Sequence, residues 1–472
     1  MFEKITYPLF NINMNTVIQK IESDEILQKV SAFNNNVYLV GGCIRDFILG
    51  KENFDKDIVI DIDNVKEYAQ KLAEKLEATF VVLDDENKIY RLVLKDKVNT
   101  IDVAGVIGNN IEEDLRRRDF TINSVGVNLK TMQILDINNG LEDIKNKSIR
   151  WISEKNLHDD PLRILRAFRF QASLGFEIEP DLLEYIKTHY KDLDKIAIER
   201  INAELIKLFE GKYADKTLLD MGELIEYFFP IMAEVKKIPT NSHHHLPLFL
   251  HSIETVKQVQ KIYDNADEKL QTQLKARLGL LKISAFLHDI GKPETWTIEG
   301  DRHRFIKHDD IGAKLVVPIL KALNFSKKQI AYISMMIKFH IYPAQVVTPP
   351  NNTTRSYTKL VRNMEDNTPD ILVLSMSDRL SALGPSITKE IVDNNISGLQ
   401  GLLNFYYETK ETIAPLPKLV DGNELMELFS LKPSPILGKI LTEIKEAQLN
   451  GDVNTKSDAI RYARIILEGE KL

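Results

Sequence analysis

The most informative motif of the N-terminal third is Tyr38-Leu39-Val40-Gly41-Gly42-Cys43-Ile44-Arg45-Asp46. An apolar, β-branched run that ends in two glycines and continues as a helix-like segment predicts a strand, a tight turn and a helix. Such a turn leaves bare backbone N–H groups at the positive end of a helix, where a phosphate group can bind. A glycine pair after a strand is more often only a tight turn, so the neighbouring motifs decide between the two interpretations.

Two acids stand two positions apart ten residues after Arg45, in Phe54-Asp55-Lys56-Asp57-Ile58. Side chains alternate along a strand, so Asp55 and Asp57 are expected to point to one face. Two hard oxygen ligands side by side can hold a pair of Mg²⁺ ions about 3.5–4 Å apart, as in-line phosphoryl transfer requires. Asp102, a lone acid in the apolar run Thr100–Val103, is expected to be a third catalytic carboxylate. The alternative is that it faces solvent at the edge of the sheet.

An arginine triplet, Arg116–Arg118, comes directly before Asp119. Such triplets are commonly solvated charge runs, but an acid after the triplet and then an apolar strand through Asn123 suggest an oriented arginine. Arg118 could clamp a phosphate, while Asn123 hydrogen-bonds a ribose or organises the turn.

Hydrophobic periodicity predicts alternating strands and helices in the N-terminal third and almost only helices from about Ser153 onward. Strands are expected at Val37–Val40, Ile58–Ile62, Phe80–Leu83, Tyr90–Leu94 and Thr100–Val103, and helices at Ile44–Leu49, Val65–Leu76, Arg163–Leu174, Asp181–His189 and Glu199–Phe209. Thr348–Thr354 is expected to be a loop and Glu411–Pro417 a linker.

Composition narrows the class of protein further. The 472 residues predict about three domains, and with 43% hydrophobic and 28% charged residues wholesale disorder is excluded. The net charge of −7 argues against a histone-like binder but leaves room for a local basic groove. Cys43 is the single cysteine, which excludes an intramolecular disulfide and a multi-cysteine metal site. Met1–Phe10 lacks signal-peptide features and no apolar run is long enough for a bilayer, so a cytoplasmic protein is expected.

Further motifs follow in a fixed order along the chain. They are Leu135-Asp136 with Gly140 and Asp143, Asp159-Asp160-Pro161-Leu162-Arg163 with Arg166, Arg169 and Phe170, and Glu199-Arg200-Ile201. Together with the motifs above, across Tyr38 to Glu210, they resemble the successive motifs of class II tRNA nucleotidyltransferases and bacterial poly(A) polymerases. The resemblance implies an α+β fold with a small polymerase-β-like head of mixed sheet plus helices. The expected domains are 1–150 (head), 151–238 (helical neck), 239–400 (HD domain) and 401–472 (helical tail).

The same resemblance implies template-independent addition of CCA, from CTP and ATP, to the 3′ end of tRNA by two-metal nucleotidyl transfer. Asp55 and Asp57 would hold Mg²⁺, with Asp102 as a further catalytic acid. The residues expected at the nucleotide are Gly41, Gly42, Arg45, Arg118, Asp119, Asn123, Asp159, Asp160, Arg163, Arg166 and Arg169. The family usually has Glu-Asp where this chain has Asp159-Asp160, and the shorter first acid changes how Asp159 can help to orient the pair of Asp160 and Arg163.

Asp160 and Arg163 are three positions apart, which places them on one face of a helix. An Asp accepts from the exocyclic amine of cytosine or adenine, and an Arg donates to the adjacent ring nitrogen. Guanine and uracil present the opposite pattern, and leaving such groups unpaired costs about 1–3 kcal/mol each. The alternative is an ordinary salt bridge on a helix surface.

Eight of the ten histidines fall between His243 and His340. The order His251, His288-Asp289, Asp378 supplies imidazoles and carboxylates suited to a divalent transition metal. This constellation resembles the HD phosphohydrolase domain, in which these four residues are the metal ligands. Further residues expected at this site are Lys292, for a substrate phosphate, and His308 and His340, for a second metal. The triplet His243–His245 is interpreted as a polar loop.

The tail is expected to hold the body of tRNA, with Lys439 or nearby basic side chains on phosphates. Poly(A) polymerase and CC-only or A-only tRNA nucleotidyltransferases remain alternatives, and an added HD-type phosphohydrolase activity is possible. A different class is an HD phosphohydrolase whose head only binds RNA or nucleotide, but the intact Asp55 and Asp57 disfavour it. Neither a membrane nor DNA is an expected partner.

Overall fold

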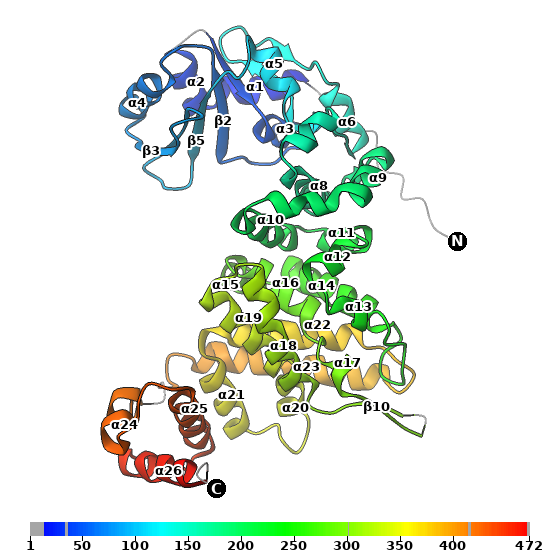
Figure 1. Ribbon diagram of the computed structural model, residues 1–472, viewed down its shortest axis with the longest axis vertical. Coiled ribbons are helices and arrows are strands. Elements are labelled where there is room, and N and C mark those ends of the chain that lie inside the picture. Colours follow the sequence, from blue (N-terminus) through cyan, green and yellow to red (C-terminus); the bar gives the residue numbers. More distant parts are fainter. Residues whose placement is uncertain (1–13, 34–35, 301, 414–416, 470–472) are drawn as a thin grey trace. The chain divides into compact units, whose positions relative to one another are not determined.

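The computed structural model describes residues 14–33, 36–300, 302–413 and 417–469, and the chain divides into two compact units, Met1–Leu224 and Ile225–Leu472 (Figure 1). The predictions for Met1–Phe10 and for part of the Glu411–Pro417 linker lie outside the described residues. Within the described ranges, none of the helices is long and apolar enough to span a membrane.

The first unit is built on a mixed seven-stranded sheet with the strand order β3-β4-β5-β2-β1-β6-β7. Its strands are β1 (Val37–Val40), β2 (Asp55–Ile60), β3 (Thr79–Asp84), β4 (Ile89–Val93), β5 (Thr100–Gly105), β6 (Gly126–Asn128) and β7 (Ile134–Leu135). Only β2 and β5 pair in parallel within this sheet; the other neighbours are antiparallel. The predicted strands of the N-terminal third are therefore confirmed, with shifts of at most three residues at their ends.

Local sequence explains how the sheet is covered. The helices of this part are α1 (Met14–Ser23), α2 (Glu25–Ser31), α3 (Gly42–Ile48), α4 (Val65–Leu76), α5 (Ile111–Arg116) and α6 (Gly140–Asn146). Helix α4 packs on strands β3, β4 and β5 through one apolar stripe, and the Asn64 side chain accepts from the N–H of Glu67 to cap it. Helix α3 packs on β1 and β2, directly after the turn at Gly41. The helix and the turn predicted from the opening motif are thus both present.

A helical segment completes the first unit (green in Figure 1). It comprises α7 (Glu154–Asp159), α8 (Leu162–Leu174), α9 (Pro180–His189), η2 (Tyr190–Lys195), α10 (Ile198–Glu210) and α11 (Ala214–Asp220), with the short parallel pair β8 (Ser148–Ile149) and β9 (Glu177–Ile178). Helix α8 packs along α10. These two helices carry most of the arginines singled out in the sequence.

Two local predictions are wrong. Asp160 and Arg163 do not share a helix, because α7 ends at Asp159 and α8 begins at Leu162. Asp160 has an extended backbone (φ −139°, ψ 90°), as expected for a residue that precedes a proline. The run Thr121–Asn123 is a 3₁₀-helix, η1, rather than part of a strand, and it ends just before β6.

The second unit is helical apart from one hairpin, β10 (Trp296–Glu299) with β11 (Arg302–Phe305). Its helices are α12 (Leu224–Phe228), α13 (Met232–Val235), α14 (Leu248–Asn265), α15 (Glu268–Lys275), α16 (Leu278–Leu287), α17 (Lys292–Thr295), α18 (His308–Ala322), α19 (Lys327–Phe339), α20 (Tyr342–Val347), α21 (Thr354–Met364), η3 (Glu365–Asn367), α22 (Thr368–Ser381), α23 (Lys389–Thr409), α24 (Gly422–Phe429), α25 (Pro435–Asn450) and α26 (Lys456–Gly469). Helix α16 packs against α14, α19 and α22, and its buried stretch Leu278–Leu287 is apolar almost all round. The last three helices enclose an apolar core of their own, centred on Leu425 and Ile440.

Candidate functional site

Three carboxylates from two neighbouring strands lie together in the first unit. Asp55 and Asp57 are on β2, and Asp102 is the parallel partner of Asp57 on β5. Thr100 Oγ1 donates to Asp55 Oδ1 over 2.5 Å, and Arg91 donates to both oxygens of Asp102 over 2.7 Å each. Strand β5 lies between β4 and β2, so the alternative of an acid at the sheet edge does not fit Asp102.

The electrostatics of this group indicate a place for a cation. Burial, with the nearby Asp102 and Asp55, raises the pKa of Asp57 to about 6, although Arg118 acts in the opposite direction. A divalent cation would stabilise the charged form of all three acids, and carboxylate oxygens are the ligands that Mg²⁺ prefers. Asp55, Asp57 and Asp102 therefore fit a divalent metal site.

The acids open into a cavity of about 640 Å³ in the first unit. Its wall contains Gly41, Gly42, Cys43, Arg45, Asp46, Asn53, Asp55, Asp57, Asp102, Arg117, Arg118, Asp119, Asn123, Asp160, Arg163, Arg166, Arg169, Phe170, Arg200 and Lys207. Every residue predicted at the metal or the nucleotide in this unit is in that wall except Asp159, which is exposed at the end of α7.

Gly41 sits where β1, the acids and the arginines meet. Its φ of +78° is in the region that favours glycine, and a Cβ there would lie 3.0 Å from Asp57 Oδ2 and 3.3 Å from an Arg118 nitrogen. Arg118 in turn donates to the fully buried Asp114 over 3.1 Å. Arg117 also binds Asp114, so only Arg116 resembles the solvated charge run considered above.

A buried network fixes the arginines on the far side of the cavity. Asn123 donates to Asp119 over 3.0 Å and accepts from Arg45 over 2.5 Å, so of its two predicted roles the structure contains the one that organises the turn. Asp119 accepts two hydrogen bonds from Arg166, of 2.6 and 2.9 Å. Burial opposes the charge of Asp119, yet Arg166 and Asn123 lower its pKa to about 2. The guanidinium of Arg166 is thus held as one half of a buried ion pair.

Phe170 supports three guanidinium groups at once. Those of Arg169, Arg45 and Arg166 lie 4.0, 5.3 and 5.4 Å from the centre of its ring. Glu204 on α10 binds Arg169 at 2.9 Å. Aromatic and carboxylate contacts of this kind hold positive charge in place without neutralising all of it.

Asp160 and Arg163 have different partners in this structure. Asp160 Oδ2 accepts from Arg200 over 3.0 Å, while its Oδ1 is buried without a hydrogen-bond partner. Arg163 donates through one terminal nitrogen to the carbonyl oxygens of Arg117 and Asn156, at 2.9 and 3.0 Å. The surface salt bridge considered as the alternative for this pair is therefore not formed.

Several residues of the site were missed in the sequence. Arg91 contacts Asp102 behind the acids, and Asp46, Asn53 and Lys207 are in the cavity wall. Lys207 could have been found, because it is seven residues after Arg200 and therefore on the same face of α10. Arg91 could not, because its position opposite Asp102 depends on the pairing of β4 with β5.

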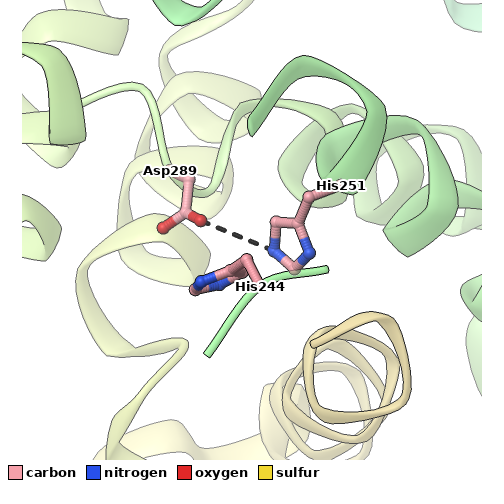
Figure 2. A group of neighbouring side chains, drawn as sticks. All are labelled: His244, His251 and Asp289. Atoms are coloured by element: carbon pink, nitrogen blue, oxygen red, sulfur yellow. Dashed lines mark ion pairs between the residues drawn. The ribbon is translucent and has the colours of Figure 1, made fainter. Parts of the chain in front are cut away.

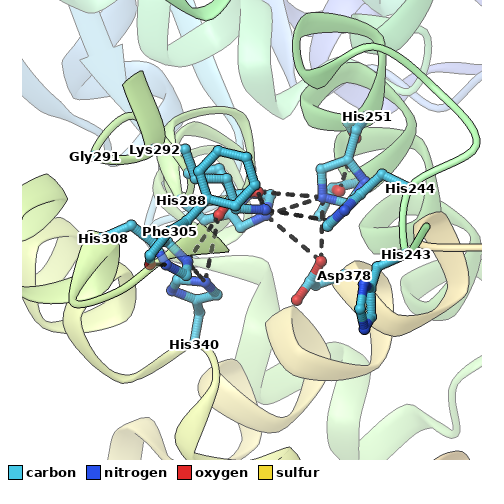
Figure 3. Close-up of polar contacts among 12 residues, drawn as sticks. His243, His244, His251, His288, Gly291, Lys292, Phe305, His308, His340 and Asp378 are labelled. Atoms are coloured by element: carbon cyan, nitrogen blue, oxygen red, sulfur yellow. Dashed lines mark hydrogen bonds and ion pairs between the residues drawn. The ribbon is translucent and has the colours of Figure 1, made fainter. Parts of the chain in front are cut away.

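The second unit contains a buried cluster of imidazoles and carboxylates (Figure 3). It joins His251 (α14), His288 (the residue after α16), Asp289, His308 (first residue of α18), His340 (the residue after α19) and Asp378 (α22). The Nε2 atoms of His251 and His288 are 3.2 Å apart, and each lies 3.2–3.6 Å from Asp289 Oδ2 and Asp378 Oδ1. On the other side, Asp289 Oδ1 lies 3.2 Å from His308 Nε2 and 3.7 Å from His340 Nε2.

Backbone carbonyls set the direction of all four rings. The Nδ1 atoms of the four histidines contact the carbonyl oxygens of Ser381, Ala285, Phe305 and Ile337 at 2.6–3.3 Å. A carbonyl oxygen only accepts, so each Nδ1 carries a proton, and Nε2 is the atom that each ring turns toward the centre. Gly291 lets the start of α18 approach the segment after Asp289 closely, because a Cβ there would lie 2.0 Å from the carbonyl oxygen of His308.

The carboxylates of this cluster hold positive charge beside them. Although burial acts against it, Asp289 and Asp378 raise the pKa of His288 to about 10. Burial and the neighbouring His288 lower the pKa of His340 to about 4. Lys292 Nζ lies 2.5 Å from Asp289 Oδ2. Nitrogen and oxygen donors that converge on one point fit a divalent transition metal.

The structure adds one histidine to this group. His244 belongs to the triplet interpreted as a polar loop, an interpretation that suits the exposed His243 and His245. His244, in contrast, is half-buried and lies with His251 and Asp289 in one group of potential metal ligands (Figure 2). The signal in the sequence that could have identified His244 is its place in a histidine triplet, seven residues before His251.

Comparisons with known families cover most of the chain. Residues 37–150 match the model of the poly A polymerase head domain, and residues 175–236 that of the probable RNA and SrmB-binding site of polymerase A. Residues 248–383 match the HD domain, and residues 406–463 match tRNA nucleotidyltransferase domain 2.

Relatives with established names match nearly end to end. An A-adding tRNA nucleotidyltransferase of Deinococcus radiodurans is 29% identical over 90% of this chain and 94% of its own length. A CC-adding tRNA nucleotidyltransferase of Thermus thermophilus is 28% identical (90% and 92%), and a CCA-adding enzyme of Ligilactobacillus salivarius is 26% identical (94% and 96%). The Thermotoga maritima CCA-adding enzyme, solved with tRNA, has a TM-score of 0.52 at 21% identity over 96% of this chain and 98% of that one. This last likeness shows that the fold is shared.

A mixed sheet with converging carboxylates, followed by helices, defines an enzyme of the nucleotidyltransferase class. Along most of its length the chain is similar to the tRNA nucleotidyltransferase and poly(A) polymerase family, and residues 248–383 of its second unit match the HD domain. Enzymes of this family and HD domains generally use divalent metal ions.

Proposed function

We propose that this chain adds nucleotides to the 3′ end of tRNA from CTP and ATP, with Mg²⁺ at the acids of the first unit. The observation that carries the proposal is the convergence of Asp55, Asp57 and Asp102 on one arginine-lined cavity. The names of the relatives support the RNA substrate, since A-adding, CC-adding and CCA-adding enzymes all match over about nine-tenths of the chain.

The acids, the arginine and the glycine turn that line the cavity have different roles in this proposal. Asp55, Asp57 and Asp102 would hold the metal, which supplies Lewis-acid stabilisation of charge on the transferred phosphoryl group when bound. Arg118, which binds Asp114 and lies beside Gly41, would bind phosphate oxygens. The glycine turn lets the triphosphate approach the backbone without a Cβ in the way.

Asp160 and Arg163 would select the base. The unpartnered Oδ1 of Asp160 is an acceptor without a donor, which the exocyclic amine of cytosine or adenine can supply. Three carbonyl contacts fix one nitrogen of Arg163 and leave its other N–H groups as donors for the ring nitrogen. Guanine and uracil would place a carbonyl against the Asp160 acceptor, which costs about 1–3 kcal/mol.

The test is nucleotide incorporation on three tRNA transcripts that end at the discriminator base, at C and at CC, each with one radiolabelled nucleotide at a time. Completion of CCA on all three is the expected result. Addition of a single A only to the CC transcript would identify an A-adding enzyme, and C addition without A a CC-adding enzyme. Long A tails would identify a poly(A) polymerase, and no incorporation on any RNA would contradict the proposal.

We propose a second activity, metal-dependent phosphohydrolysis, for the cluster in the second unit. Its support is the set of Nε2 and carboxylate atoms around Asp289, with Lys292 as the residue placed for a substrate phosphate. His308 and His340 would hold a second metal through Asp289 Oδ1. Hydrolysis of bis(p-nitrophenyl) phosphate and p-nitrophenyl phosphate with Mn²⁺, Co²⁺ or Ni²⁺ tests it, and no metal-dependent release with any ion would contradict it.

We also propose the four-part division 1–150, 151–238, 239–400 and 401–472, with the tail on the tRNA body and the protein acting in the cytoplasm. The separate apolar core around Leu425 and Ile440 supports an independent tail. Removal of residues 401–472 should raise the KM for tRNA while the KM for nucleotide changes little; equal changes in both would argue against this role.

A further inference from the structure

His244 lies outside the ligand set that the sequence predicts for the HD centre, yet it lies beside that centre. It precedes α14 in the chain, and His244, His251 and Asp289 offer ligand atoms that are all within 4.8 Å of one another (Figure 2). Its ring stands edge-on to that of His251, with the ring centres 4.6 Å apart. A solvated loop histidine would not be expected to make either contact.

The orientation of His244 repeats that of the four other histidines of the cluster. Its Nδ1 lies 3.3 Å from Asn241 Oδ1, an amide oxygen that accepts and cannot donate. The proton of the neutral ring is therefore on Nδ1, and the Nε2 lone pair is on the opposite side, toward Lys292. An oxygen acceptor behind the distal nitrogen is the usual support of a metal-binding imidazole.

The loop that carries His244 is fixed to the element that carries Asp378. Gly384, just after α22, donates its N–H to the carbonyl oxygen of His243 over 2.7 Å, and Ser386 donates to that of Ser242 over 2.9 Å. A Cβ at Gly384 would lie 2.3 Å from the His243 carbonyl carbon, so the two segments are in direct backbone contact. The position of His244 relative to Asp378 is thus set by main-chain hydrogen bonds.

A positive charge already lies between His244 and the cluster. The ammonium group of Lys292 is 3.3 Å from His244 Nε2 and 2.5 Å from Asp289 Oδ2. An imidazole lone pair and a carboxylate oxygen on either side of one cation are donors of the type that a divalent transition metal takes. The ammonium group of Lys292 thus occupies a position between two donors that a divalent metal ion could also contact.

We propose that His244 is a metal ligand of the HD centre, adding a third imidazole to the ion held by His251, His288, Asp289 and Asp378. The inference rests on the proposal that this cluster binds a metal, but it does not depend on any hydrolytic activity. With His244 on the metal, Lys292 is released from its hydrogen bond to the ring and becomes available for a phosphate. An extra imidazole also favours ions such as Co²⁺ and Ni²⁺ over Mn²⁺ and Mg²⁺.

The experiment is a Co²⁺ titration of the chelator-treated full-length chain, followed by visible absorption and by equilibrium dialysis. Imidazole-bound Co²⁺ is coloured, and His288→Ala supplies the background from the carboxylates of the first unit. His244→Ala should weaken Co²⁺ binding about 10- to 100-fold and change the absorption bands. His243→Ala, an exposed histidine of the same triplet whose Nδ1 contacts Ser242 Oγ, is the matched control and should bind Co²⁺ as the wild type does.

The outcomes distinguish metal binding by the cluster from the role of His244 in it. Wild-type protein that binds no Co²⁺ above the His288→Ala background would overturn both the metal centre and the role of His244. Wild-type and His244→Ala proteins with equal affinity and equal spectra would overturn the role of His244 alone. His244→Gln keeps a polar side chain in the loop, so the same loss of affinity in that variant at an unchanged melting temperature excludes a folding defect as the cause.

Discussion

The carboxylate group of the first unit and the histidine–aspartate cluster of the second unit both bring acids together, but in opposite surroundings. In the first unit, Asp55, Asp57 and Asp102 project from β-strands into an open cavity of about 640 Å³. In the second, Asp289 lies almost fully buried among imidazoles that come from the ends of helices. An open group of oxygen ligands has room for a triphosphate and an RNA end, whereas a closed group of nitrogen and oxygen ligands suits an ion and a small phosphate.

The carboxyl pKa values show the same contrast. Burial and the other acids raise the pKa of Asp57 to about 6. Asp289 is more deeply buried, which by itself would raise its pKa, yet His288 and Lys292 hold that pKa well below its usual range. The first centre therefore depends on a cation from outside for its charge balance, and the second supplies much of the positive charge from its own side chains.

The largest expected effect tests the first centre. Asp57→Ala should reduce nucleotide addition by about 10³-fold or more, because a metal ligand and its electrostatic stabilisation of the transition state are lost. Asp61→Ala, an exposed acid just beyond β2, should leave the rate unchanged. The measurement is single-turnover addition to tRNA with melting temperatures in parallel. Near wild-type addition by Asp57→Ala would remove Asp57 from the metal site.

The second prediction asks whether the two centres act independently. His288→Ala or Asp289→Ala should lower metal-dependent phosphohydrolase activity at least about 100-fold and leave tRNA addition within about twofold, since the ligands belong to different units. Both activities are measured on the same preparation. Parallel loss of both at an unchanged melting temperature would contradict two separate centres.

A smaller effect is expected where the base is selected. Asp160→Asn should lower kcat/KM for CTP and ATP about five- to a hundred-fold, corresponding to about 1–3 kcal/mol, and should affect UTP and GTP far less. Arg163→Ala should act in the same direction, with added losses because Arg163 also binds the carbonyls of Arg117 and Asn156. Steady-state kinetics with all four nucleotides decide the matter. Equal losses for all four would indicate a purely structural role.

The smallest effect concerns stability and pH. Folding raises the pKa of Asp57 from 3.8 to about 6. Ionisation of Asp57 therefore lowers the free energy of unfolding as the pH rises from about 4 to 6, and above pH 6 this loss is at most about 3 kcal/mol. Without divalent ions, Asp57→Asn should therefore melt at a higher temperature than wild type at pH 8, and the difference should shrink between pH 6 and 4. A difference independent of pH would instead point to packing, and Mg²⁺ should stabilise only the wild type.

Sequence patterns were sufficient where spacing alone determines geometry. Period-two alternation placed Asp55 and Asp57 on one face, and helical periodicity found α4 and α8 within one or two residues. The order of the motifs then identified the family and most of the cavity wall. Only Asp159 among the predicted residues of the first unit is outside that wall, since the extended backbone at Asp160 separates it from α8.

The remaining features depend on contacts between distant segments. Arg91 meets Asp102 through strand register, and Arg200 meets Asp160 through the packing of α10 on α8. His244 is turned into the cluster by hydrogen bonds to the segment around Gly384. The end of the helix between Asp160 and Arg163, in contrast, could have been predicted from the sequence, because Pro161 disfavours a helical backbone in the preceding residue.

The parallel pairing of β2 with β5 has a consequence for folding. Asp57 and Asp102 become neighbours only when β5 joins β2 across an intervening helix and two strands, whereas β3, β4 and β5 can pair through short connections. Closing the longer loop costs more chain entropy, so the non-local pair is expected to form after the local hairpins. The three acids are then expected to come together only after the local hairpins have formed.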